Sequence, residues 1–280
     1  MKTLKDKVAA ITGAGSGIGR ATAILMARQG CHLALSDVNE TGLADTVREC
    51  KAHGVKVTGT RLDVADRAAF EAWADETVKQ FGGVNIVINN AGVALGATVE
   101  DTSYEDFEWL MGINFWGVVY GTKAFLPHIK ASGDGHIVNI SSVFGIIAVP
   151  TQSAYNAAKF AVRGFTESLR EEMEVEGAPV GVTCVHPGGI KTNIARAARM
   201  SGNATYGMDK AKAASDFDKL ARTTPEEAGQ DIVDAILKNR RRQLIGADAV
   251  LIDLVQRLLP TSYQRILVAG ARRQRAKAGA

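Results

Sequence analysis

Short apolar runs alternate with helical patterns along this chain, and the alternation restricts its fold more than any other feature. The runs have the length of buried strands, and glycine or polar residues close them. Strands separated by helices return in the same direction, so they pair in parallel and need helices on both faces of the sheet. The sequence therefore predicts an α/β fold with a doubly wound parallel sheet.

The expected elements run from residue 7 to residue 245. The expected strands are residues 7–12, 31–36, 55–62, 85–89, 135–140, 180–185 and 243–245. The expected helices are residues 13–30, 41–53, 66–81, 104–129, 152–176 and 225–240. Residues 191–224 are polar and alanine-rich, and they show no clear strand.

No internal repeat or linker interrupts this pattern, so we expect a single domain over residues 1–280. Its hydrophobic content of 46% is enough for one large core. Within the domain we expect a substrate lid at residues 193–224, because such folds usually carry a mobile segment there. Residues 247–280 form a C-terminal extension.

The composition narrows the class of partner and the compartment. A net charge of +3 gives no reason to expect a nucleic-acid partner. Cys31, Cys50 and Cys184 show no CxxC spacing, so we expect neither a disulfide framework nor a metal site. The N-terminus lacks a signal-peptide pattern, and no apolar run is long enough to span a bilayer. These features favour the cytoplasm.

A glycine-rich turn follows the first expected strand and opens the first helix, with the sequence TGAGSGIG at residues 12–19. Gly13, Gly17 and Gly19 let the backbone turn tightly and approach a pyrophosphate, while helix N–H groups face its charge. Ser16 and Ile18 lie between these glycines. The turn alone fits a tight strand–helix corner, but its place at the first strand favours a Rossmann-like dinucleotide site.

Asp37 closes the second expected strand. A carboxylate there accepts hydrogen bonds from the adenosine ribose hydroxyls and repels the 2′-phosphate that distinguishes NADP. Ser16 and Val38 flank the expected phosphate position, and neither is basic. The sequence therefore favours NAD over NADP as cofactor. The alternative is that Asp37 only caps the next helix.

Tyr155 and Lys159 are four residues apart, which places them on one face of a helix. An ammonium there favours the phenolate, and lowering a tyrosine pKa by ~3 units takes ~4 kcal/mol. The positive ring of an oxidised nicotinamide would add to this effect. Ser142, thirteen residues earlier, is placed to hydrogen-bond the reacting oxygen. Together they form an acid/base device for hydride chemistry, although in isolation the pair also fits a solvated helix.

These motifs, taken together and in order, resemble the short-chain dehydrogenase/reductase family in its single-domain form. The motifs are TGAGSGIG, Asp63, NNAG at residues 89–92, Asn114, Ser142, YNAAK at residues 155–159 and PGGIKT at residues 187–192. The resemblance implies that Tyr155 transfers the proton, Lys159 lowers its pKa and Ser142 orients the substrate oxygen, with Ser141 as a decoy. It also implies that Asn114 holds a water beside Lys159. The other cofactor-binding residues that it implies are Asp63, Val64, Asn90, Ala91, Gly92, Pro187, Gly188, Ile190 and Thr192.

The expected substrate pocket is mostly apolar. Phe144 and Val149 follow Ser142 in a largely apolar stretch, and Gln152 is its main polar residue before Tyr155. We therefore expect a hydrophobic secondary alcohol or ketone, as in an alcohol dehydrogenase or a ketoreductase. Some of these side chains could instead belong to the core or to a subunit contact. A NAD-binding regulator and a peripheral membrane protein on the same fold remain alternative functions.

Two patterns bear on partners other than the substrate. The expected helices at 104–129 and 152–176 are apolar on more than one face, and the family resemblance places both at a two-fold interface. We expect a homotetramer, with a homodimer as the alternative. Residues 250–268 carry apolar patches broken by Pro260, and basic residues follow. This tail is either a weak peripheral membrane anchor or, as we favour, a cover that is buried over the pocket or a partner subunit.

Overall fold

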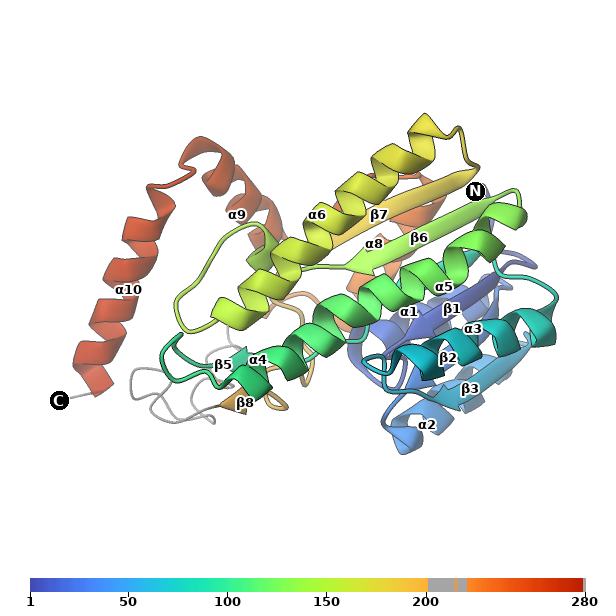
Figure 1. The fold of residues 1–280 in the computed structure, drawn as a ribbon, viewed down its shortest axis with the longest axis horizontal. Helices are drawn as coiled ribbons and strands as arrows, with labels where there is room; N and C mark the ends of the chain where they lie inside the picture. Colours follow the sequence, from blue (N-terminus) through green and yellow to red (C-terminus); the bar gives the residue numbers. More distant parts are fainter. Residues whose placement is uncertain (201–214, 216–220, 279–280) are drawn as a thin grey trace.

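The computed structural model describes residues 1–200, 215 and 221–278. Its centre is a sheet of seven parallel strands in the order β3-β2-β1-β4-β6-β7-β9 (Figure 1). The strands are β1 Val8–Thr12, β2 His32–Asp37, β3 Val57–Arg61, β4 Ile86–Asn89, β6 Gly135–Ile140, β7 Val180–Pro187 and β9 Arg242–Ile245. The predicted parallel sheet is therefore confirmed.

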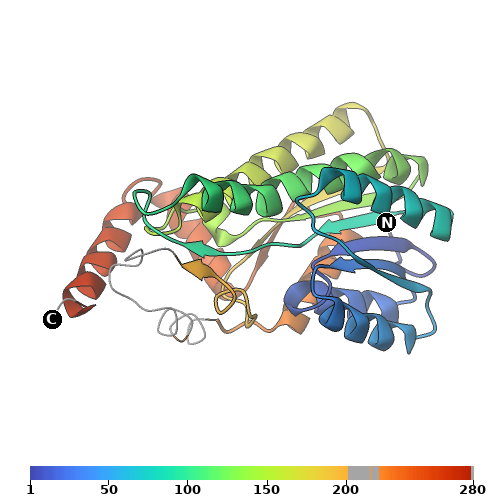
Figure 2. The same ribbon diagram turned by 60° about the horizontal axis from the view of Figure 1, so that its bottom comes forward.

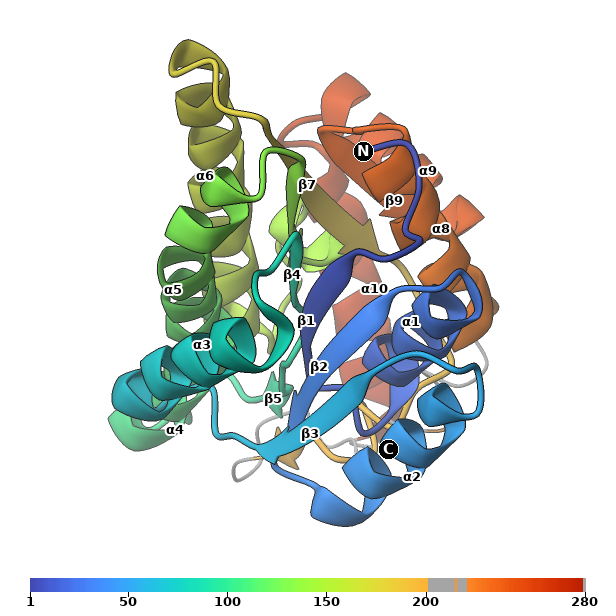
Figure 3. The same cartoon turned by 90° about the vertical axis from the view of Figure 1, so that its right-hand side faces the viewer.

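Helices cover both faces of the sheet, as Figure 3 shows. Side chains of each strand alternate between the two cores: Ile11 and Ile88 enter one, and Ala10 and Val87 enter the other. The first face carries α1 Gly17–Arg28, α2 Glu40–Lys51 and α8 Pro225–Leu237. The opposite face carries α3 Arg67–Phe81, α4 Tyr104–Met111, α5 Gly117–Ala131 and α6 Ser153–Val175. The predicted doubly wound, single-domain fold is correct.

The long helix expected at residues 104–129 contains an irregular turn. A π-helical turn, Gly112–Trp116, joins α4 to α5 and contains the buried Asn114. A π-turn adds a residue to one helical turn and is often found at functional sites. The apolar pattern of the sequence continues through this turn, so it does not reveal the extra residue.

A second, two-stranded sheet lies outside the predicted pattern. It consists of β5 Leu95–Gly96 and β8 Arg199–Met200, which pair in parallel. The expectation that residues 191–224 contain no strand is therefore wrong, because a two-residue strand is too short to show a period. Much of the expected lid, residues 201–214 and 216–220, lies outside the described residues.

The C-terminal extension forms two helices, α9 Ala247–Leu258 and α10 Tyr263–Ala278, with Pro260 between them. Figures 1 and 2 show α10 at one end of the molecule, beyond the carboxyl ends of β6 and β7. Tyr263 packs against Ile146 and Ile147, which follow Ser142 in the chain. The tail is thus only partly the buried cover that we expected, because Leu251 and Leu258 are 60% and 70% exposed. No helix among the described residues has the length and apolar content needed to cross a bilayer.

Candidate active site

The glycine turn between β1 and α1 leaves the start of α1 open. Gly13 and Gly17 have φ angles of 64° and 52°, in the left-handed region that favours glycine. A Cβ atom on Gly19 would lie only 2.2 Å from the carbonyl oxygen of Gly13. The side chain of Ser16, at the N-cap position, makes no capping hydrogen bond to the first turn of α1. Uncapped N–H groups at a helix start fit the pyrophosphate of a dinucleotide.

Asn90 supports this turn from the end of β4. Its side-chain Nδ2 donates to the carbonyl oxygens of Thr12, at 2.9 Å, and of Gly13, at 3.1 Å. The hydroxyl oxygen of Thr12 accepts hydrogen bonds from the backbone N–H groups of Asn90 and Ala91. The NNAG segment therefore fixes the shape of the glycine turn, which is consistent with its expected place under a cofactor.

Asp37 lies beside the glycine turn at the carboxyl end of β2. Its Oδ2 accepts a hydrogen bond from the backbone N–H of Gly15, and its Oδ1 accepts one from Asn39, both at 2.8 Å. The N-cap of α2 is Asn39, whose side chain accepts from Gly42. The alternative that Asp37 caps the helix is therefore wrong. Each carboxylate oxygen can accept a second hydrogen bond, which suits ribose hydroxyls.

Three other expected cofactor positions lie at the same carboxyl edge of the sheet. Asp63 follows β3 and accepts a hydrogen bond from the backbone of Ala65 at 3.0 Å, and Val64 is buried. Thr192 lies beside the glycine turn, because a Cβ on Gly17 would be 3.2 Å from its methyl group. A dinucleotide bound along this edge would reach all of them, as the fold rule for open parallel sheets predicts.

The turn after β7 has a support that the sequence did not reveal. The carboxylate of Asp248, in the first turn of α9, accepts a hydrogen bond from the backbone N–H of Gly189 at 2.6 Å. A Cβ on Gly188 would lie 2.3 Å from the same carboxylate, so glycine is required there. Ile190 follows this turn and is buried. Asp248 is distant in sequence from this turn, and no local pattern links the two.

The expected catalytic residues meet next to this edge. Ser142 precedes a 3-10 turn, Val143–Gly145, and Tyr155 and Lys159 lie in the first two turns of α6. A Cβ on Gly92 would lie 3.3 Å from Oδ1 of Asn114 and 3.6 Å from Nζ of Lys159. The Nζ of Lys159 lies 5.6 Å from the ring centre of Tyr155. Asn114, Ser142, Tyr155 and Lys159 therefore come together from three separate segments: the π-turn, the end of β6 and α6.

Asn114 has a structural role here that sequence analysis did not assign. Its side-chain Oδ1 accepts from the backbone N–H of Val93, and its Nδ2 donates to the Val93 carbonyl, both at 2.8 Å. This pair fixes the segment that follows the NNAG motif against the π-turn. Because both ends of the amide have partners, a water beside Asn114 stays a prediction.

Burial opposes the charged forms of both Tyr155 and Lys159. It raises the pKa of Tyr155 to about 12, and a hydrogen bond with Ser142 lowers that pKa in part. It lowers the pKa of Lys159 to about 8, while Nζ donates to the Ile140 carbonyl at 3.0 Å. The sequence analysis expected Lys159 to lower the tyrosine pKa. In the protein alone desolvation has the larger effect on the pKa of Tyr155. A further positive charge beside the phenol would therefore be needed to bring that pKa toward neutral pH.

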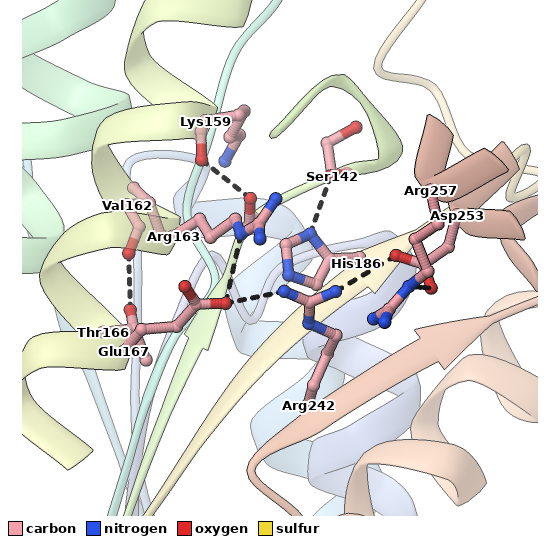
Figure 4. A network of polar contacts seen from close by, with 11 residues as sticks. Ser142, Lys159, Val162, Arg163, Thr166, Glu167, His186, Arg242, Asp253 and Arg257 are labelled. Carbon is pink, nitrogen blue, oxygen red and sulfur yellow. Dashed lines mark hydrogen bonds and ion pairs between the residues drawn. The ribbon is translucent and has the colours of Figure 1, made fainter. Parts of the chain in front are cut away.

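Figure 4 shows a polar network behind Ser142. The Nδ1 of His186 lies 2.9 Å from the Ser142 carbonyl oxygen, and burial lowers the pKa of His186 to about 4. The ring is therefore neutral near pH 7 and donates from Nδ1. Arg242 bridges Glu167 on α6, at 2.7 Å, and Asp253 on α9, at 3.0 Å. This bridge ties α6, which carries Tyr155 and Lys159, to the C-terminal extension.

Ser141, the neighbouring serine that the family resemblance does not make catalytic, has a structural role. Its hydroxyl donates to the Lys159 carbonyl at 2.8 Å and is buried. A Cβ on Gly145 would lie 2.3 Å from the same hydroxyl oxygen. This contact leaves Ser142 as the serine that faces Tyr155.

The loop that carries the expected substrate residues is held from two sides. Asn156, which follows Tyr155, donates to the carbonyls of Phe144 and Ile147 and accepts from Val149 N–H at 3.1 Å. The phenol oxygen of Tyr263 accepts a hydrogen bond from the Ala148 N–H at 3.1 Å.

Two of the expected substrate residues lie near Tyr155. The ring of Phe144 lies 6.1 Å from that of Tyr155 in an edge-to-face contact. Gln152 is half-buried at the N-cap position of α6. The expected pocket wall therefore faces Tyr155 from the same loop.

A parallel sheet with an open glycine turn at its first strand and a tyrosine–lysine pair beside it defines a dinucleotide-dependent oxidoreductase. The comparisons with known proteins agree. A family model described as short chain dehydrogenase matches residues 7–202. The chain therefore belongs to the short-chain dehydrogenase/reductase family and is an oxidoreductase of that family.

Relatives and solved structures of this family match nearly the whole chain. The putative oxidoreductase SadH of Mycobacterium tuberculosis is 54% identical and covers 96% of this chain and 97% of its own. A Burkholderia phymatum short chain dehydrogenase/reductase, solved in complex with NAD, has a TM-score of 0.82 at 33% identity, over 92% and 95%. Levodione reductase has a TM-score of 0.77 at 29% identity, over 88% and 99%.

Proposed function

We propose that this protein transfers a hydride between NAD and a hydrophobic secondary alcohol or ketone. The observation that carries the proposal is the convergence of Ser142, Tyr155 and Lys159 beside Gly92, next to the glycine turn. The nicotinamide, when bound, supplies the hydride acceptor or donor. A solved relative of similar fold binds NAD, which supports a nicotinamide cofactor here.

The residues of this chain divide the remaining work. The Ser142 hydroxyl, which hydrogen-bonds the Tyr155 phenol, is placed to orient the substrate oxygen. In alcohol oxidation Tyr155 accepts the hydroxyl proton. In ketone reduction its phenol donates a proton to the substrate oxygen. Lys159 holds a positive charge behind the phenol and stabilises its anionic form. His186 holds the Ser142 backbone in place through the carbonyl oxygen.

The apolar character of the loop after Ser142 supports a hydrophobic substrate. Phe144 and Val149 are half-buried, so part of each side chain is available to a ligand, although both pack against the cluster in which Ile146 and Ile147 are buried with Tyr263. Only part of the expected apolar wall is therefore available, and the rest belongs to the core, which was the alternative for these side chains.

The proposal is tested by absorbance at the NADH band. Purified protein is incubated with NAD and a series of secondary alcohols of increasing length, and separately with NADH and the matching ketones. We expect NADH formation, with kcat/KM increasing with the apolar size of the alcohol. NAD binding without turnover on any member of the series would instead favour a NAD-binding regulator.

Asp37 is proposed to select NAD over NADP. Its carboxylate lies 2.8 Å from the Gly15 N–H at the glycine turn, where a 2′-phosphate would meet its charge. We expect Asp37→Ala to lower the ratio of the NADP dissociation constant to the NAD dissociation constant by about tenfold or more, since repulsion of the 2′-phosphate is removed. Calorimetric titration of both cofactors measures this ratio. Asp63→Ala changes another expected cofactor residue and is the control: it should affect both dissociation constants alike and leave their ratio unchanged. Tighter binding of NADP by the wild type would contradict the proposal.

We also propose a homotetramer or homodimer assembled through α4, α5 and α6. Trp116, at the end of the π-turn between α4 and α5, and Phe160 on α6 are 47% and 41% exposed, although both are large and apolar. Trp116 also stacks on Tyr120, at 5.8 Å between ring centres. Light scattering at micromolar concentration should show a multiple of the 29.7 kDa chain mass. Trp116→Glu should shift the particle toward that mass, and a monomeric wild type would contradict this assembly.

A further inference from the structure

The C-terminal helices carry an exposed apolar surface that the proposed catalysis does not use. Of the thirteen large apolar side chains found exposed among the described residues, seven belong to α9, α10 or their connection. We name this set the hairpin surface, and its residues are Val250, Leu251, Leu254, Leu258, Leu259, Ile266 and Val268. Such a concentration of exposed apolar groups marks an interaction site.

The hairpin surface faces outward because the inward sides of both helices are already occupied. In α9, Ile252 and Val255 pack toward the substrate loop, and in α10 Tyr263 and Leu267 do the same. Val250, Leu254 and Leu258 follow at intervals of four residues, so they form a stripe on the other side of α9. Within the part of the chain that the structure describes, nothing covers this stripe.

The charge on α10 has one sign, whereas α9 also contains Asp248, which accepts a hydrogen bond from Gly189, and Asp253. Helix α10 contains no acidic residue, and Arg265, Arg272 and Arg273 on it are exposed. On α9, Asp253 is buried and paired with Arg242 and Arg257, so it offers no negative charge to the outside. Exposed apolar side chains on α9 and α10, combined with exposed arginines on α10, are the composition of helices that lie in a membrane interface.

We propose that the hairpin surface binds to an anionic phospholipid bilayer, with α9 and α10 lying along its surface. The apolar side chains would enter the headgroup boundary, and the arginines would pair with lipid phosphates and anionic headgroups. A second copy of this chain fits less well. A two-fold contact places the same patch on both partners, which would bring the arginines of two α10 helices together.

This placement has a consequence for substrate access. The hairpin packs on the loop that contains Phe144 and Val149, through the Tyr263 hydrogen bond to Ala148. A bilayer on the hairpin would therefore lie beside the expected pocket, where an apolar substrate dissolved in lipid could enter. Membrane binding itself does not rest on the proposed function, since it uses none of the catalytic residues.

Vesicle flotation of the full-length protein tests the proposal. We expect the wild type to float with phosphatidylcholine vesicles that contain phosphatidylglycerol, and to float less as salt is raised. The double variant Arg272→Gln/Arg273→Gln should lower the partition coefficient roughly thirtyfold, since each arginine near the surface contributes to binding. Leu254→Ser/Leu258→Ser should lower the partition coefficient about tenfold or more, both on phosphatidylcholine vesicles with phosphatidylglycerol and on those without it.

Matched substitutions elsewhere separate the hairpin from general surface effects. Val175→Ser on α6 and Arg48→Gln on α2 change equally exposed side chains and should leave flotation unchanged. Light scattering on the same variants tests for a second copy. A wild type that stays unbound to phosphatidylglycerol vesicles would overturn the proposal. So would equal losses in the control variants, or a dimer that the Leu254→Ser/Leu258→Ser change converts to monomers without any effect on flotation.

Discussion

Tyr155→Phe should lower kcat by about a thousandfold, with NAD binding nearly unchanged, because only the transferable proton is removed. The side chain keeps its volume, so its edge-to-face contact with Phe144 remains. Initial rates on an alcohol that the wild type accepts, together with a NAD titration, separate the two effects. Tyr104→Phe, a change at an exposed tyrosine on α4, is the control and should keep full activity.

The pH dependence gives the same assignment a second test. Alcohol oxidation needs the phenolate, so the wild-type rate should rise with pH and level off above the pKa of Tyr155. Burial holds that pKa at about 12 in the protein alone. A rate that levels off at lower pH would show that Lys159 and bound cofactor lower it during turnover. The assignment would be wrong if Tyr155→Phe kept wild-type turnover, or if its residual activity had the same pH profile as the wild type.

Gly19→Ala should abolish NAD binding and destabilise the fold by about 3 kcal/mol, because the added methyl group has no space. It would lie 2.2 Å from the Gly13 carbonyl oxygen and 2.5 Å from Nδ2 of Asn90. The Gly13 carbonyl belongs to the backbone and cannot rotate away from the added methyl group. The Asn90 hydrogen bonds that hold the glycine turn therefore have to break. Urea unfolding and a NAD titration measure the two losses.

Gly164→Ala is the matched control for this substitution. Gly164 lies inside α6, and a Cβ there would meet nothing within 4 Å. Alanine should therefore raise the free energy of unfolding by about 0.5–1 kcal/mol, since it favours the helix. If Gly19→Ala bound NAD normally, the glycine turn could not be the pyrophosphate site.

The sequence predicted the sheet and the cofactor edge because both leave local signals. Buried parallel strands appear as short apolar runs, and the glycine turn has a fixed spacing. The supports of the site leave no such signal. Tyr263 and Ala148 are 115 positions apart, and Asp248 is 59 positions from Gly189. Asn156 was within the YNAAK motif, but its three hydrogen bonds to the loop depend on a fold that a single sequence does not show.

For the outward apolar face of α9 and α10, the sequence offered a peripheral anchor as an alternative but favoured burial. Apolar patches in a tail indicate burial only if the protein itself provides a covering surface, and here the inward face alone has one. The pKa of Tyr155 is raised, not lowered as the sequence predicted, for a related reason. The spacing of Tyr155 and Lys159 reports their proximity, whereas the desolvation that dominates both pKa values depends on every neighbouring element.

The buried Lys159 makes stability and activity compete in this protein. Burial lowers its pKa from the ordinary 10.5 to about 8, so below pH 8 the folded state is destabilised by about 3 kcal/mol relative to an exposed lysine. The unfolded chain binds more protons between these two pKa values, so this penalty declines as pH rises through that range. An apolar residue at this position would avoid the desolvation penalty, so the stability cost of Lys159 accompanies the acid/base role proposed for it.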